Sequence, residues 1–195
     1  REKINFQFPI SNFQSNPNIK VQNTKLLTID ETVDKAVFPG LQGGPHLNQI
    51  AAMAQCFEEA MRPNFKKYAA QIVKNAKTLS DELQKLEWRI VSGGTDTHLL
   101  LVDTGARGVG GKEASEMLEN ANIVTNMNTV PYDTRPPMNP SGLRLGTPAV
   151  TTRGMKEKEM KKIAGWIDAT LLKKKGLMVI KKEVVGICKR FSLFY

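Results

Sequence analysis

The sequence predicts an α/β fold in which helices cover a small, mostly antiparallel sheet. Two long segments of helical periodicity come first, and short β-like segments then alternate with shorter helices. The β-like segments are brief and some of their connections are tight, which favours antiparallel pairing. With 195 residues, 41% of them hydrophobic, the chain can bury a core of about one domain.

The first half of the chain is expected to hold two long helices. Residues 1–29 form an irregular leader without a sustained period. A helix is predicted from Pro45 to Met61, where apolar residues recur on one face. Pro63 then starts a second helix, whose broad apolar stripe continues to Leu86.

The second half alternates between strands and helices. Strands are predicted over residues 88–91, 98–103, 143–145 and near 123–126, and helices over 112–120, 155–172 and about 177–189. Thr151 or Thr152 is the expected N-cap of the helix over 155–172. Four prolines make residues 131–140 a long loop, and loops of that length are often functional.

The charge balance of +9 requires that an acidic partner be considered. Much of the excess lies in residues 153–162 and 173–182. Such lysine-rich faces are usually solvated surface, but a basic module that binds nucleic acid or an acidic partner remains an alternative. No run of about 18 apolar residues and no secretory signal is present, so we expect a soluble, cytoplasmic protein without membrane contact.

The two cysteines, Cys56 and Cys188, lie far apart inside apolar helical patterns. Their spacing suggests neither a disulfide framework nor a metal site. We therefore expect small core residues in a reducing compartment, and we predict no metal site.

Four short motifs could carry chemistry, and each has a simpler reading. Gly43-Gly44-Pro45 feeds a helix whose free N–H groups could hold an anion, or it is only a turn. Arg144 lies between two leucines and could grip a carboxylate with its planar guanidinium, or simply face solvent. Asp96 and His98 could form an acid–base pair or fix their turn, and Asn128 could read a heterocycle edge or form a turn.

The wording and order of these motifs together resemble the serine hydroxymethyltransferase family, also called glycine hydroxymethyltransferase. The matching segments are AVFPGLQGGPH (36–46), VSGGTDTHL (91–99), NMNTVP (126–131) and SGLRLGTPAVTTRG (141–154). The ending ICKRF (187–191) also looks like the C-terminus of the family. The resemblance begins near Ile29 and implies the C-terminal part of such an enzyme.

The resemblance implies a cofactor, substrates and site residues. The family uses pyridoxal phosphate on the aspartate-aminotransferase-like fold (fold type I). It interconverts serine plus tetrahydrofolate and glycine plus 5,10-methylenetetrahydrofolate. By motif, Gly43 and Gly44 would meet the cofactor phosphate of a neighbouring subunit, and Arg144 would hold the substrate carboxylate. The residues that would lie against the folate are Asn128, Pro136, Pro137 and Met138.

The resemblance also predicts that this sequence does not provide the Schiff-base lysine of the family. The family's Thr-Thr-His-Lys segment, whose lysine forms the Schiff base, does not occur in the sequence, and its spacing from Gly43 falls near Ile10. We therefore predict no catalytic residue here and a partial enzyme that is inactive alone. A homodimer or a complementing N-terminal chain would be its partner, and nucleic acid is not expected to be one.

The domain division implied by the resemblance has three parts. Residues 1–29 are the leader, residues 30–62 a remnant of the large cofactor-binding domain with its last helix, and residues 63–195 the small C-terminal α+β domain. Asn48, Thr97 and Met127 depart from the commonest family residues, which are histidine, asparagine and lysine. Because Met127 removes a charge beside the expected folate site, folate affinity is the role that the sequence supports least.

Overall fold

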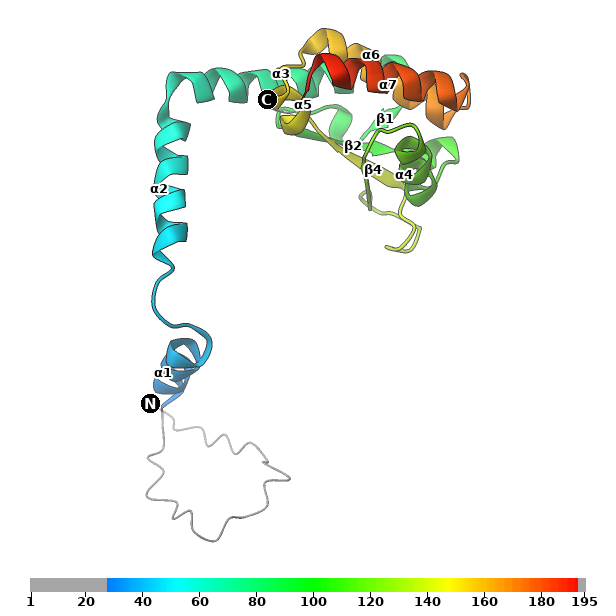
Figure 1. Ribbon diagram of the computed structural model, residues 1–195. Coiled ribbons are helices and arrows are strands. Elements are labelled where there is room, and N and C mark those ends of the chain that lie inside the picture. The colour runs from blue at the N-terminus through cyan, green and yellow to red at the C-terminus, as the bar shows by residue number, and fades with distance from the viewer. Residues whose placement is uncertain (1–27, 193–195) are drawn as a thin grey trace. The chain divides into compact units, whose positions relative to one another are not determined.

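The computed structural model describes residues 28–192, in which a small sheet is combined with helices (Figure 1). The expected leader therefore lies outside the described residues, apart from its last two positions. The helices are α1 (Ile29–Lys35), α2 (Leu47–Met61), α3 (Pro63–Lys85), α4 (Gly111–Asn120), α5 (Pro148–Thr152), α6 (Glu157–Leu171) and α7 (Leu177–Arg190). Short helical turns are η1 (Ala36–Leu41), η2 (Val91–Gly93) and η3 (Gly105–Arg107), and the strands are β1 (Arg89–Ile90), β2 (Leu99–Asp103), β3 (Asn126–Asn128) and β4 (Gly142–Gly146).

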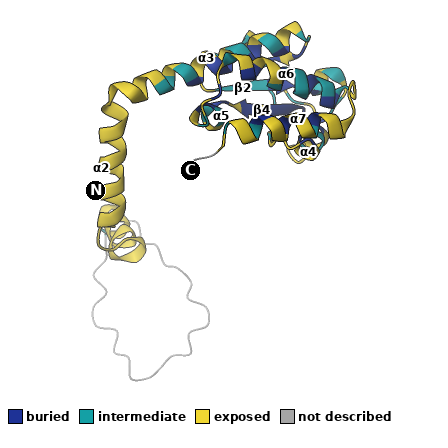
Figure 2. Cartoon of the chain, turned by 45° about the horizontal axis from the view of Figure 1, so that its top comes forward, coloured by how far each residue is buried: buried dark blue, intermediate teal, exposed yellow. Residues whose placement is uncertain are grey.

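The chain separates into two compact units that divide between Cys56 and Phe57. In the first unit, α1 begins with a reciprocal cap: the Glu31 N–H donates to the Thr28 hydroxyl (3.4 Å) and the Thr28 N–H donates to the Glu31 carboxylate (3.0 Å). No residue of α1, η1 or α2 is buried, as the yellow ribbon of α2 in Figure 2 shows.

The second unit is built around a four-stranded sheet of order β1-β2-β4-β3, and every pairing is antiparallel. This confirms the small antiparallel sheet and the α/β class expected from the sequence. Leu143 and Leu145 of β4 face the same side as Leu100 and Val102 of β2, because each of these leucines is paired directly with one of them. This face packs against helices and forms the core.

The core of the second unit consists of apolar side chains from the sheet and from the helices that cover it. Its buried members include Leu79 and Leu83 of α3, Leu118 of α4, Met160, Ala164 and Ile167 of α6, and Ile187 of α7. Asn75 of α3 is a fully buried polar residue, and its side-chain amide donates to the Thr151 hydroxyl and to the Met155 carbonyl, both at 2.9 Å. Asn75 therefore ties α3 to α5 and to the segment that enters α6.

Several element boundaries differ from the sequence prediction by one or more residues, and local hydrogen bonds explain three of these differences. Helix α2 begins at Leu47, because the His46 carbonyl accepts the first bonds of the helix, from Gln49 and Ile50. Strand β3 begins only at Asn126, because the backbone N–H of Ile123 bonds back to Leu118 and closes α4.

The predicted N-cap at Thr151 or Thr152 is also wrong. Both threonines belong to the short helix α5, and the N-cap of α6 is Lys156. The Thr151 hydroxyl donates to the Thr147 carbonyl inside that helix at 2.7 Å, so it is not available to cap the next one.

The expected burial of both cysteines is confirmed only in part. Both are free thiols, but Cys56 is exposed and Cys188 is half-buried. Cys56 lies on α2, none of whose residues is buried. In the described part of the chain, no helix is both long and apolar enough to cross a bilayer.

Candidate functional site

Arg144 occupies the middle of β4, an interior strand that pairs with β2 on one side and β3 on the other. Its neighbours in β4 are buried, whereas Arg144 itself is exposed, as the alternation of a strand requires. Leu101 and Asn126 are its direct partners on the two flanking strands and therefore share its face of the sheet. This face is the one opposite the core.

Within residues 28–192, the Arg144 guanidinium makes no hydrogen bond or ion pair. Three other arginines of this unit are engaged by the fold. Arg89 pairs with the buried Asp103 carboxylate (2.5 Å), Arg107 donates to the Leu86 carbonyl (2.9 Å), and Arg153 donates to two carbonyls at the end of α7. The N–H donors of the planar Arg144 guanidinium are therefore available to a ligand at the open face of the sheet.

Asn128 lies on the same face as Arg144, two residues along β3 from the Asn126 that pairs with Arg144. Its side-chain N–H donates to the Thr129 carbonyl at 2.8 Å, which leaves the side-chain oxygen as an acceptor. The structure therefore brings Asn128 and Arg144 to one surface, although they are far apart in the sequence.

The proline-rich loop, residues 131–140, joins β3 to β4 and so connects the strands that carry these two residues. Pro136, Pro137 and Met138 are exposed, and 77% of Met138 is accessible. The loop thus offers an apolar tip beside the sheet.

Asp133 holds the two ends of this loop together. Its carboxylate accepts from the backbone N–H groups of Val130 (3.3 Å), Arg135 (3.0 Å) and Ser141 (2.8 Å), and from the Ser141 hydroxyl (2.6 Å). These bonds, above all that of the Ser141 hydroxyl, hold the pKa of Asp133 well below its usual range.

The base of the loop also packs tightly against the start of α4. The Gly111 N–H donates to the Pro140 carbonyl at 2.7 Å. A Cβ atom at Gly111 would lie 2.4 Å from the Gly142 carbonyl oxygen and 2.8 Å from that of Pro140. Glycine is therefore required here by the close approach of two backbones.

Gly43 and Gly44 belong to the first unit and lie ahead of α2, so the structure does not relate them to Arg144. Neither glycine has a left-handed backbone, and an added Cβ at either would meet no atom within 4 Å. The fold of the described chain therefore gives no reason for glycine at these two positions.

The turn at Asp96 and His98 is fixed by threonines. The Thr95 hydroxyl donates to the Leu99 carbonyl (2.6 Å) and accepts from the Thr97 N–H (3.1 Å). Asp96 and His98 are exposed, and no group of three potential metal ligands occurs in residues 28–192. The threonine side chains therefore fix this turn, and among residues 28–192 the side chains of Asp96 and His98 make no hydrogen bond that would do so.

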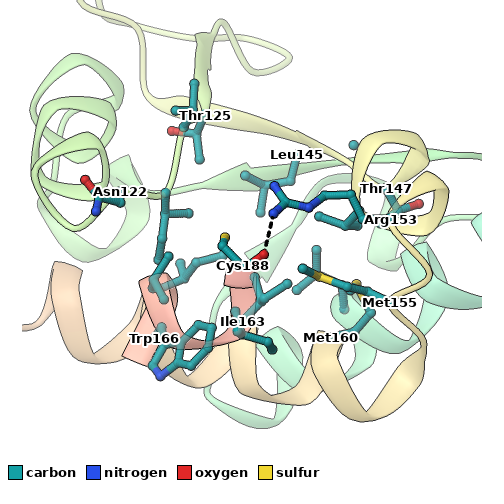
Figure 3. A pocket seen from close by; sticks show the side chains of 18 of the residues that line it. Asn122, Thr125, Leu145, Thr147, Arg153, Met155, Met160, Ile163, Trp166 and Cys188 are labelled. Atoms are coloured by element: carbon teal, nitrogen blue, oxygen red, sulfur yellow. Dashed lines mark hydrogen bonds between the residues drawn. The ribbon is translucent and has the colours of Figure 1, made fainter. Parts of the chain in front are cut away.

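A cavity of about 310 Å³ opens where residues 122–125 diverge from β4 (Figure 3). Figure 3 shows the Arg153 guanidinium directed at the Cys188 carbonyl on one side, with Met155, Met160, Ile163 and Trp166 on another. The cavity is mainly apolar, and its lining includes Arg144 as well as Arg153, whose guanidinium binds the end of α7.

Sequence reasoning missed Asp133 and Asn126. Asp133 could have been found from the sequence, because an aspartate side chain often accepts a hydrogen bond from the backbone N–H two residues later. Asp133 accepts such a bond from Arg135. Asn126 could not have been found in this way, because only the register of β3 against β4 places it beside Arg144.

Comparison with known proteins identifies the family. The family model for serine hydroxymethyltransferase matches residues 15–167, so the match begins earlier than Ile29, where the motif resemblance starts. A serine hydroxymethyltransferase from Koribacter versatilis (strain Ellin345) is 50% identical over 165 residues, which cover 83% of this chain. The same alignment covers only 39% of that relative. This chain belongs to the serine hydroxymethyltransferase family.

Proposed function

We propose that this chain supplies the substrate-carboxylate and folate-contacting part of a serine hydroxymethyltransferase. The reaction would be the pyridoxal phosphate-dependent interconversion of serine plus tetrahydrofolate and glycine plus 5,10-methylenetetrahydrofolate, on the aspartate-aminotransferase-like fold (fold type I). Residues 30–62 would be the end of the large domain and residues 63–195 the small domain.

The observation that carries the proposal is the free guanidinium of Arg144 on the open face of the sheet. An internal ion pair would have engaged this group, as the buried Asp103 carboxylate engages Arg89. An arginine that is held by two strand ladders and has no partner in the described chain is suited to bind a carboxylate with two parallel hydrogen bonds. The carboxylate would be that of serine or glycine.

Gly43 and Gly44 would hold the phosphate of the cofactor. Both have open space where a side chain would be, and their N–H groups have no acceptor in the described chain. A phosphate can approach such a backbone closely, next to the N-terminus of α2. When bound, pyridoxal phosphate supplies an electron sink for the bond that breaks in the amino-acid substrate.

Asn128 and the loop tip at Pro136, Pro137 and Met138 would contact the folate. The Asn128 side-chain oxygen is free to accept from a ring N–H, and the loop tip is exposed and apolar. Asp133 would set the position of this tip, because it fixes both ends of the loop.

We further propose that these residues do not catalyse the reaction alone, since they contain no Thr-Thr-His-Lys segment. Mixing the purified chain with pyridoxal phosphate and borohydride should give no cofactor attached to a specific lysine. Specific attachment together with cleavage of serine would contradict this part of the proposal. A complementing N-terminal chain would then not be needed to supply the lysine.

A chimera tests the proposal that this chain supplies the substrate-carboxylate and folate contacts. The aligned segment of the Koribacter versatilis relative would be replaced by the corresponding 165 residues of this chain, so that the relative supplies the rest. We expect serine cleavage with tetrahydrofolate. Arg144→Ala should raise the KM for serine by about a hundredfold, because one partner of a charged hydrogen-bonded pair is lost.

Arg89→Ala is the matched control in the same chimera, since Arg89 is an arginine of the same sheet whose partner is internal. It should lower stability and leave the KM for serine within about twofold. If Arg144→Ala and Arg89→Ala change the KM equally, Arg144 does not bind the substrate carboxylate.

A further inference from the structure

Positive charge is concentrated on the last two helices of the second unit. Residues 153–190 contain twelve basic and four acidic side chains, so they hold eight of the nine excess charges of the chain. Each of the four acids already has partners. Glu157 contacts Lys74 and Gln71, Glu159 accepts from the Lys156 N–H, Asp168 accepts from Trp88 and Lys174, and Glu183 accepts from Trp166 and Lys175. Most of the basic side chains are therefore not neutralised within the described chain.

A groove of about 640 Å³ lies between α6 and α7 in the middle of this basic surface. Its lining comes from one face of each helix, because the residues recur at spacings of three and four. They are Lys162, Gly165, Trp166 and Ala169 of α6, Glu183, Gly186, Ile187 and Arg190 of α7, and Lys175 between them. The groove is thus apolar along its floor, where small residues meet Trp166 and Ile187, and basic along its rim.

Two glycines keep this floor open. Gly165 and Gly186 lie inside helices, where glycine is less favourable than alanine. A Cβ atom at either position would meet no other atom within 4 Å, so the packing of the chain does not exclude a side chain. The space above both glycines is available to something that approaches the helix backbones.

Trp166 gives the groove a fixed apolar wall. Its indole N–H donates to the Glu183 carboxylate at 2.8 Å, and Lys175 binds the other oxygen of Glu183 at 2.6 Å. The one acid in the groove is therefore neutralised, and the half-buried indole is held in place. An apolar side chain of a partner could pack against it.

We propose that the α6–α7 groove binds an acidic amphipathic helix of another protein. Leucine-like side chains of such a helix would lie along the apolar floor, and its carboxylates would meet Lys162 and Arg190. A single-stranded nucleic acid would find the cations but only one aromatic platform, so the acidic helix fits better. Because α6 and α7 pack on the core face of the sheet, this site is independent of the one at Arg144.

The full chain can be titrated with a fluorescein-labelled acidic peptide of about four helical turns, with leucines on one face and glutamates elsewhere. Anisotropy should show binding that weakens as salt is raised, and the emission of Trp166 should change. The same peptide with lysines in place of glutamates should not bind. Gly186→Leu should weaken binding by about tenfold by filling the floor, whereas Val185→Leu, an exposed neighbour outside the groove, should leave it unchanged.

Charge variants distinguish binding of the peptide in the groove from general attraction of the peptide to the basic surface. The double variant Lys162→Gln and Arg190→Gln removes two charges from the rim, and Lys182→Gln with Lys189→Gln removes two exposed charges of α7 outside the groove. We expect the first pair to weaken peptide binding about tenfold more than the second. Equal losses, or no effect of Gly186→Leu, would overturn the proposal. Tighter binding of an oligouridine or of anionic vesicles than of the peptide would also overturn it.

Discussion

Helices α2 and α3 follow one another in the sequence and carry the same kind of apolar stripe, yet they differ completely in burial. Phe57 of α2 is 66% exposed, whereas Leu83 of α3 is 0% exposed and lies in the core. An amphipathic pattern therefore indicates that a helix has a partner surface, but not that the partner is part of the same stretch of chain. No residue of α2 is buried, and the chain spans only 39% of the length of its relative.

The largest expected effect tests this contrast directly. Leu83→Ala should reduce the free energy of unfolding by about 2–5 kcal/mol, because it leaves a cavity in the core. Phe57→Ala should change it by less than about 0.5 kcal/mol, since its side chain is largely in solvent already. Urea unfolding of the full chain measures both. Similar losses for the two variants would mean that α2 is packed against the rest of the chain in solution.

Loss of a buried side-chain amide should lower the free energy of unfolding nearly as much as loss of a core leucine. Asn75→Ala removes the donor to the Thr151 hydroxyl and the Met155 carbonyl, and should cost about 2–3 kcal/mol. Asn48→Ala, an exposed position on α2, is the control and should be nearly neutral. If urea unfolding showed that Asn75→Ala costs no more unfolding free energy than Asn48→Ala, the stabilising role of the Asn75 hydrogen bonds would be contradicted.

Two glycines, one from each unit, provide a third contrast. Gly111→Ala should destabilise the chain by about 1–3 kcal/mol, because its Cβ would press on two backbone oxygens. Gly43→Ala has open space and should leave thermal stability unchanged. In the chimera, however, Gly43→Ala should weaken pyridoxal phosphate binding. Unchanged cofactor affinity would remove the proposed role of Gly43.

The smallest effect concerns pH. Because hydrogen bonds lower the pKa of Asp133 in the folded chain, its stabilisation is present above the unfolded pKa of about 4 and is lost as pH falls through the folded value. The protection factor of the Ser141 amide, which compares its exchange rate with that of an unfolded peptide at the same pH, should therefore fall on acidification below about pH 4. Asp133→Asn should lower this protection at neutral pH as well, and Asp30→Asn, in α1, should leave Ser141 protected.

The sequence predicted the architecture of the second unit better than its details. Short β-like segments indicated an antiparallel sheet, and the alternation around Arg144 allowed it to face solvent, as it does. The start of β3 was not predicted correctly, because Ile123 uses its N–H to close α4. Periodic patterns therefore located the elements, and individual hydrogen bonds at the helix ends decided where they begin and end.

The candidate site shows the same division. Motif wording singled out Arg144 and Asn128 separately, but only the register of β3 against β4 shows that they share a face. The exposure of Cys56 could not be foreseen either, because an apolar helical pattern predicts burial whether or not the covering surface is present.

The pairing of β4 on both sides has a consequence for how Arg144 is kept in place. Because side chains alternate between the two faces of a strand, a slip of β4 by one residue would turn Arg144 into the core and expose Leu143 and Leu145. The need to bury Leu143 and Leu145 therefore also fixes the orientation of Arg144. A misregistered sheet would carry a buried, unpaired charge, so the forms of this domain that fold stably are those in which Arg144 points outward.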